Sequence, residues 1–212
     1  MDAVKEKQEI MTAVTEKKDV FLSTKTRTTP LVFHDDNYFI VVISPLVSIM
    51  KEQVIFLNAI GFSATYIGRD EKENVDIEDG KFTFVFSSPE ILLGDQKWRN
   101  VMLSNRPKLR LIVSGEADTM GESHSPEKHF REWFGHMGEV RSLCPGTPLM
   151  VLTATAGPKN REKIYRKLCL VNPLEIVENI DRPNIKLFLK KVKASNNLAD
   201  VFFWLIDGLQ RQ

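Results

Sequence analysis

The chain has 212 residues, of which 42% are hydrophobic and 27% charged, and its formal net charge is +1. This composition is typical of one full-size globular domain. Because 29 basic residues are balanced by 28 acidic ones, the composition argues against a protein that holds nucleic acid by bulk charge, although it is compatible with a local basic groove.

The cysteines and the apolar runs narrow the class further. Cys144 and Cys169 lie far apart, with no CxxC pair and no second Cys/His cluster, so we expect no zinc site and two indifferent or buried thiols in a reducing compartment. No run of about 18 apolar residues occurs, and the N-terminal MDAVKEKQEI lacks the apolar core of a secretory signal. We therefore expect an intracellular protein with no membrane segment.

Short apolar runs alternate with amphipathic stretches along the chain. Runs rich in β-branched or aromatic residues predict strands over residues 38–44, 63–68, 82–88, 109–114 and 148–155. Amphipathic segments between them predict helices over residues 45–59, 97–104, 126–143 and 158–168, several of which open with proline. Continuous apolar strands separated by helices indicate an α/β domain, a parallel sheet with helices on both faces.

The C-terminal part continues this pattern after Asp181-Arg182-Pro183-Asn184. IKLFLKKV predicts one more strand, and LADVFFWLIDGLQ predicts an amphipathic helix. Its apolar face comprises Leu198, Val201, Phe202, Leu205, Ile206 and Leu209. Such a face needs a partner, which is either the domain itself or a further domain.

Three loops that follow predicted strands carry small hydroxyl residues. Open parallel sheets bind ligands outside the carboxyl ends of their strands. Ser44-Pro45-Leu46, Ser88-Pro89-Glu90 and Thr153-Ala154-Thr155 each place hydroxyls beside a predicted helix start, where hydroxyls and free N–H groups can receive phosphate oxygens. The plain alternative for each loop is helix capping.

These loops form part of an ordered set of motifs. Gln8 in KEKQEI, SPLVSIMKEQV, SSPE, SGEAD, HFREWFG, LTATA and DRPNI follow one another along nearly the whole chain. In this order they resemble the first motor domain of RecQ-like DNA helicases of superfamily two. The resemblance implies a RecA-like, P-loop NTPase-type fold and ATP-dependent 3′ to 5′ separation of DNA strands. It also implies ATP and magnesium as cofactors, single-stranded or forked DNA as partner, and a nuclear location.

The resemblance assigns roles to individual residues. Gln8 resembles the glutamine that reads adenine, Glu116 resembles the acid that positions the attacking water, and Thr153 and Thr155 resemble the motif that couples hydrolysis to DNA. Residues that resemble strand-tracking elements are Ser44, Lys51, Arg69 and Ser88, and Arg131 lies with Phe130, Trp133 and Phe134 in an aromatic element that senses DNA by stacking. The plain alternatives are an exposed helix residue for Gln8, a solvated loop charge for Arg69 and core packing for the aromatic residues.

The chain departs from the family where the family binds phosphate. No glycine occurs between Asp19 and Phe33, so the Gly-rich loop ending in Gly-Lys-Ser or Gly-Lys-Thr is absent, and the segment is too short for the loop and its helix. Lys25 or Arg27 can approach phosphate only electrostatically, outside that scaffold.

The magnesium-binding strand and the segment after it are altered too. Gly115 and Asp118 stand where the family has the Asp and His of its DEAH box, so the carboxylate that holds magnesium is missing, and we expect no metal ligand. The segment after this box, TMGESHSPEKHF, also lacks the tryptophan that RecQ-type enzymes usually have between the box and the Phe-Arg pair.

We therefore expect residues 1–192 to form a degenerate RecA-like helicase domain. Residues 193–212 are expected to form a linker and a helix that would open a second motor domain, which the sequence lacks and which would supply an arginine finger. The expected function is an ATP-binding and DNA-binding motor domain that is catalytically inactive as it stands. Two alternatives stay open: a non-catalytic adaptor that binds single-stranded nucleic acid or protein, and a decayed gene fragment. The short KKVK run at residues 190–193 provides no clear nuclear signal.

Overall fold

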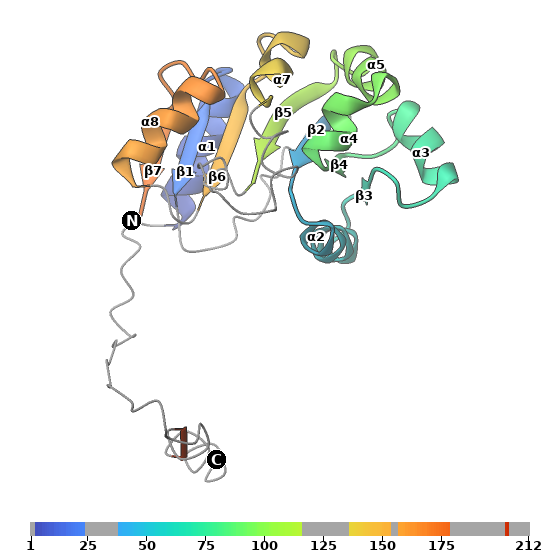
Figure 1. Cartoon of the computed structure of the whole chain (residues 1–212), viewed down its shortest axis with the longest axis horizontal. Helices are drawn as coiled ribbons and strands as arrows, with labels where there is room; N and C mark the ends of the chain where they lie inside the picture. The colour runs from blue at the N-terminus through green and yellow to red at the C-terminus, as the bar shows by residue number, and fades with distance from the viewer. Residues whose placement is uncertain (1–2, 24–37, 116–135, 154–156, 179–201, 204–212) are drawn as a thin grey trace, which may run out of the picture. The chain divides into compact units, whose positions relative to one another are not determined.

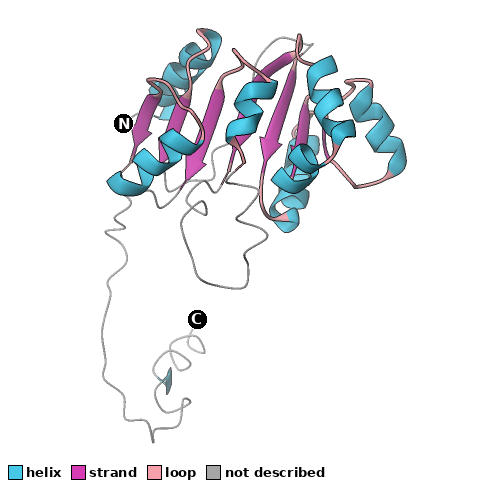
Figure 2. Cartoon of the chain, turned by 45° about the horizontal axis from the view of Figure 1, so that its top comes forward, coloured by secondary structure: helices cyan, strands magenta, loops and turns pink. Residues whose placement is uncertain are grey.

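The computed structural model describes residues 3–23, 38–115, 136–153, 157–178 and 202–203. The chain divides into two units, Met1–Ile180 and Asp181–Gln212. In the first unit, a seven-stranded sheet carries helices on both faces (Figures 1 and 2). The α/β fold with a parallel sheet, expected from the alternation of apolar runs and amphipathic segments, is confirmed.

The sheet is parallel throughout its described pairings. Its strands lie in the order β3-β4-β2-β5-β6-β1-β7. Their bounds are β1 Val20–Ser23, β2 Phe39–Ile43, β3 Ala64–Tyr66, β4 Phe84–Ser87, β5 Leu109–Ser114, β6 Leu149–Thr153 and β7 Leu174–Val177. Because all strands run the same way, their carboxyl ends share one edge of the sheet, which we call the carboxyl edge. The opposite one is the amino edge.

Seven helices are described in the first unit, and they cover the two faces of the sheet unequally. Their bounds are α1 Ala3–Thr15, α2 Val47–Ala59, α3 Glu71–Glu78, α4 Pro89–Gly94, α5 Gln96–Ser104, α7 Gly138–Leu143 and α8 Pro158–Lys167. In the second unit, only residues 202–203 of a further helical stretch are described. Buried side chains of α1 and α2 pack on one face, and those of α3, α4, α5, α7 and α8 pack on the other. No helix within the described ranges has the length and apolarity needed to cross a bilayer.

Alternation along each strand explains why the strands read as continuous apolar runs. In β1, Val20 and Leu22 belong to the core under α1 and α2, whereas Phe21 belongs to the core under the other helices. All three are at most 1% exposed. A strand that is buried on both faces has no solvent-exposed face, so polar residues are found mainly at its ends.

The boundaries differ from the sequence predictions in a few places. α2 begins at Val47 with Leu46 as its N-cap, not at Pro45, because Ser44 still continues the sheet ladder. α1, β1, α3, α4 and β7 were not predicted. α3 presents only Val75 and Ile77 as apolar residues, and its start is set by Asp70, whose carboxylate accepts the Glu73 N–H at 2.7 Å.

Some predictions lie outside the described residues. Of the predicted helix over residues 126–143, only residues 136–143 are described; Gly138–Leu143 is helical, and the two residues before it form a turn. The predicted strand after Asn184 lies outside entirely, and the amphipathic segment beyond it is described only at residues 202–203. The proposed boundary at residues 192 and 193 therefore stays a prediction.

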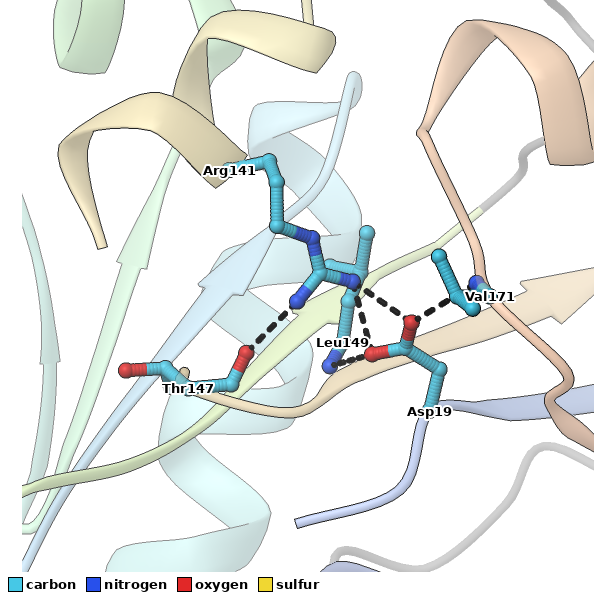
Figure 3. A network of polar contacts seen from close by, with 5 residues as sticks. All are labelled: Asp19, Arg141, Thr147, Leu149 and Val171. Atoms are coloured by element: carbon cyan, nitrogen blue, oxygen red, sulfur yellow. Dashed lines mark hydrogen bonds and ion pairs between the residues drawn. The ribbon is translucent and has the colours of Figure 1, made fainter. Parts of the chain in front are cut away.

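The amino edge is held by a buried ion pair (Figure 3). The Asp19 carboxylate, 7% exposed, accepts hydrogen bonds from the Arg141 guanidinium at 2.7 Å and from the N–H groups of Leu149 at 2.9 Å and Val171 at 3.3 Å. Arg141 also donates to the Thr147 carbonyl at 2.9 Å. One carboxylate thus joins the start of β1 to the start of β6, to α7 and to the segment before β7.

Candidate functional site

Hydroxyl residues gather at the carboxyl edge of the sheet. Five strands end in, or run directly into, a serine or threonine that is at most 6% exposed: Ser23, Ser44, Ser87, Ser114 and Thr153. Strand pairing aligns them, since Ser23 is the register partner of Thr153, and Ile43 is the partner of both Ser87 and Ser114. Sequence reasoning had singled out Ser44 and Thr153 of this row but missed Ser23 and Ser114.

Two of these hydroxyls have no partner. The Oγ atoms of Ser23 and Ser114 are buried and make no hydrogen bond within the described structure, whereas the Ser87 hydroxyl donates to the Ser88 carbonyl at 2.9 Å. Buried polar atoms without partners are uncommon in folded proteins and call for an explanation such as a ligand or water. Their location at the edge where parallel sheets bind ligands marks this edge as the candidate site.

The backbone of the same edge is already committed. The Ser44 N–H donates to the Ser87 carbonyl at 3.0 Å, and the Gly115 N–H donates to the Ile43 carbonyl at 2.9 Å. The Ser44 N–H is therefore not available to phosphate, whereas the role predicted for its hydroxyl and for the helix start after it stays a prediction.

Gly115, which the sequence resemblance aligns with a metal-binding aspartate, directly follows β5. A side chain would fit there, because a Cβ built on Gly115 would meet the Ile43 carbonyl oxygen at 3.7 Å, an ordinary contact. The backbone therefore leaves room for a larger side chain at residue 115, and steric crowding does not explain why this residue is glycine. Glu116 and Asp118, the acidic residues that follow, lie outside the described residues.

The strand-tracking candidates lie after β2 and β4, which are neighbours in the sheet. Ser44 precedes α2 without capping it, and Ser88 is the N-cap of α4 but makes no side-chain capping bond. The capping alternative is therefore wrong for Ser44, whereas Ser88 holds the N-cap position without a side-chain bond. Ser88 is partly exposed, and Lys51 is exposed on the first half of α2.

Arg69 is engaged by its own neighbourhood. Its guanidinium forms an ion pair with the Glu73 carboxylate at 3.1 Å, and the same carboxylate accepts a hydrogen bond from Thr65. The Arg69 side chain is 45% exposed, so this pair is worth little in stability. It nevertheless competes with any phosphate for Arg69, and the strand-tracking role of this residue stays a prediction.

Gln8 is exposed on α1, as the plain alternative expected. It lines a shallow, open groove of about 480 Å³ together with Lys5, Thr12, Glu16 and other residues, including Leu174. Leu174 starts β7, so the groove extends toward the amino edge and not toward the hydroxyl row. The adenine-reading role of Gln8 stays a prediction.

Several candidates cannot be located. Lys25, Arg27, Arg131 and Thr155 lie outside the described residues, and so does the aromatic element around Arg131.

The two thiols differ in their exposure. Cys144 is fully buried, and burial raises the pKa of its thiol, whereas Cys169 is exposed. Among the described residues, no group of three or more His, Cys, Asp or Glu side chains could hold a metal ion.

The fold is that of the RecA-like domains found in solved helicase structures. The solved structure of the DUF1998 helicase MrfA bound to DNA and AMPPNP matches 84% of this chain and 27% of its own chain, with a TM-score of 0.64 and 13% identity. The Mycobacterium smegmatis helicase Lhr bound to ssDNA and AMP-PNP matches 97% of this chain and 30% of its own, with a TM-score of 0.57 and 12% identity. At such identities the likeness shows the fold alone.

Sequence comparison finds relatives of this chain among RecQ-type helicases. The chain is 31% identical over 169 residues to the mouse bifunctional 3′-5′ exonuclease/ATP-dependent helicase WRN. This match covers 78% of the chain and 12% of the relative. It is also 32% identical over 166 residues to the ATP-dependent DNA helicase RecQ of Pasteurella multocida. This match covers 74% of the chain and 25% of the relative. No family model matches. The chain thus resembles a RecQ-type motor domain and spans a quarter or less of these two relatives.

Proposed function

We propose that this chain is a RecQ-type motor domain that binds single-stranded DNA but does not hydrolyse ATP. The observation that carries the proposal is the end of β5, where Ser114 and Gly115 bring no carboxylate to the place where the sequence resemblance predicts a metal-binding one. The other half of the carboxyl edge, after β2 and β4, keeps a serine after each strand and an exposed lysine beside it. The two halves of one edge therefore differ in what they retain.

The nucleotide half lacks the groups that phosphoryl transfer needs. Catalysis of this reaction consists mainly of positioning and of neutralising charge on the transferred phosphoryl group, and a metal ion supplies several kcal/mol of that stabilisation. Gly115 offers no carboxylate, and its N–H is held by Ile43. The absence of glycine between Asp19 and Phe33 supports the same conclusion, since converging N–H groups need glycine backbones.

The DNA half keeps groups that suit a phosphate backbone. The Ser88 side chain is not used for capping, and Lys51 extends from α2 into solvent. Phosphate contacts of this kind position a strand without reading its sequence. The strand would follow the edge across β2 and β4, while the Arg69–Glu73 pair at the next strand would have to open for Arg69 to join.

Calorimetric titration with ATP, with and without magnesium, tests the nucleotide half. We expect no magnesium-dependent binding at micromolar concentrations. G115D is the matched variant: the site has room for the side chain, so the fold should persist, and the restored carboxylate alone should not confer hydrolysis. Micromolar, magnesium-dependent binding by the unmodified chain would contradict the proposal.

Fluorescence anisotropy with a labelled oligothymidylate of about 20 nucleotides tests the DNA half. We expect binding that weakens steeply between about 50 and 200 mM salt, and K51E should weaken it about three- to tenfold. K7E, at an exposed lysine of α1, makes the same charge change elsewhere and should have a smaller effect. Equal losses in both variants would leave only bulk charge and refute the assignment of this edge.

A further inference from the structure

A row of basic side chains runs along the outer surface of α8. The row, which we call the α8 stripe, consists of Lys159, Lys163, Arg166 and Lys167, all exposed. Their spacing places them on one side of the helix. Ile164 and Leu168, which are 2% and 0% exposed, anchor the opposite side in the core.

The α8 stripe concentrates charge in a nearly neutral chain. α8 contains five basic residues and one acidic residue, a net +4, so the rest of the chain, whose total is +1, carries −3. The acidic counterpart is residues 70–79, with six carboxylates and one lysine, which precede and include α3. α8 packs over β1 near one end of the sheet and α3 lies near the other (Figure 1). Separated charge of this kind gives a molecule a basic pole.

Three cations of this pole, Lys159, Lys163 and Arg166, are little engaged by the described residues. Arg166 approaches Glu162 at 3.6 Å, but both side chains are mostly exposed, at 83% and 74%, and such pairs contribute little. For Lys159 and Lys163 the structure shows no ion pair among the described residues. The stripe can therefore exchange its counterions for an external polyanion.

We propose that the α8 stripe binds the phosphate backbone of nucleic acid, as a contact separate from the loops after β2 and β4. A protein partner fits less well, because protein interfaces are depleted in lysine and enriched in aromatic residues, and the stripe has no exposed aromatic or apolar residue. A lipid surface fits less well, because an interfacial helix must insert its apolar face, and Ile164 and Leu168 are already buried in the core.

The dimensions suit a polyanion. From Lys159 to Lys167 the stripe spans eight residues, or about 12 Å of helix. Duplex DNA carries one charge per about 1.7 Å of axis, counting both strands, so several phosphates lie within reach. Each phosphate neutralised adds about 0.9 to the slope of log affinity against log salt.

The test measures binding of the full chain to a labelled duplex of about 20 base pairs and to oligothymidylate, across a salt series. K159E/K163E is compared with K7E/K72E, which places the same charge change on exposed residues of α1 and α3. We expect the first variant to bind at least about tenfold more weakly, with a salt slope lower by about 2, and the second to stay nearer the unmodified chain. K159Q/K163Q should show a smaller loss in the same direction.

Other outcomes overturn the inference. Equal losses in the two charge-reversal variants would mean that only net charge matters, and unchanged affinity in K159E/K163E would leave the stripe a solvated helix face. Circular dichroism and thermal melting check that the variants fold, and the glutamine variant serves if charge reversal unfolds the chain. K51E separates this inference from the proposed function: loss in K51E alone rejects the α8 stripe, and loss in K159E/K163E alone rejects the edge after β2.

Discussion

The amino and carboxyl edges of the sheet treat their polar groups in opposite ways. At the amino edge, both oxygens of Asp19 accept hydrogen bonds, from Arg141 and from two backbone N–H groups (Figure 3). At the carboxyl edge, the hydroxyls of Ser23 and Ser114 are buried without partners among the described residues. The amino edge also has one buried atom without a partner, the Nε of Arg141. The difference teaches that the buried carboxylate of the amino edge is fully satisfied, whereas two buried hydroxyls of the candidate ligand edge are not.

Physical costs account for this separation. A buried charge is tolerated only when its partners and hydrogen bonds offset the loss of hydration, and Asp19 meets this condition. An unsatisfied buried hydroxyl costs about 1–3 kcal/mol, a cost that a ligand or water can remove.

The largest expected effect is at Asp19. D19A should lower the free energy of unfolding by about 3–5 kcal/mol, because it leaves Arg141 partly buried without its carboxylate and removes acceptors from two N–H groups. Urea unfolding followed by circular dichroism measures the change. The matched control is E16Q, which breaks the exposed Lys18–Glu16 pair, 2.8 Å apart, and should cost less than about 1 kcal/mol. Similar losses in both variants would remove the distinction between a structural and a functional edge.

Five of the seven strands could be predicted from the sequence because they read as long apolar runs; β1, although it is buried on both faces, was not among the predicted strands. The predicted strand over residues 109–114 coincides with β5, and the predicted helix over residues 158–168 extends one residue beyond α8. β7 was missed because Leu174–Val177 is a short edge strand in which only Ile176 is buried. An edge strand with one buried side chain produces almost no periodic signal.

The candidate site could be predicted only in outline. The hydroxyls of Ser44 and Thr153 were selected because they belong to motifs, whereas Ser23 and Ser114 lie inside apolar runs and read as strand residues. Their lack of partners depends on neighbouring strands, which sequence spacing does not reveal. The Asp19 network was missed for the same reason, since Asp19 and Arg141 are joined only by the fold. The α8 stripe had a local signal, five basic residues in the ten of α8, that was overlooked beside the balanced net charge.

An effect of intermediate size is expected from Tyr165, a residue of α8, through the pH dependence of the free energy of unfolding. Tyr165 packs edge-on against Phe21 with ring centroids 5.2 Å apart, and burial, with the nearby Glu175 carboxylate, raises the pKa of its phenol well above its ordinary value. The neutral phenol is therefore favoured in the folded state. Its stabilisation is complete below about pH 10, the unfolded pKa, and is lost as pH rises above it.

Urea unfolding at about pH 8, 10 and 11 measures this loss, and Y165F should reduce the pH dependence above pH 10. Cys144 contributes in the same direction from a lower pH, because burial also raises its thiol pKa; C144A should therefore act in an earlier window. An unchanged profile in Y165F would show that the phenol ionises as readily in the folded chain as in the unfolded one.

The smallest expected effect tests the carboxyl edge most directly, because its sign is informative. Ser87 and Ser114 are both fully buried at strand ends, but only the Ser87 hydroxyl has a hydrogen-bond partner. S87A should lower the free energy of unfolding by about 0.5–1.5 kcal/mol, whereas S114A should leave it unchanged or raise it by up to about 1 kcal/mol. Chemical unfolding of the two variants beside the unmodified chain resolves such a difference. A loss in S114A as large as that in S87A would mean that the Ser114 hydroxyl is satisfied in solution, and the contrast between the two edges would then rest on Asp19 alone.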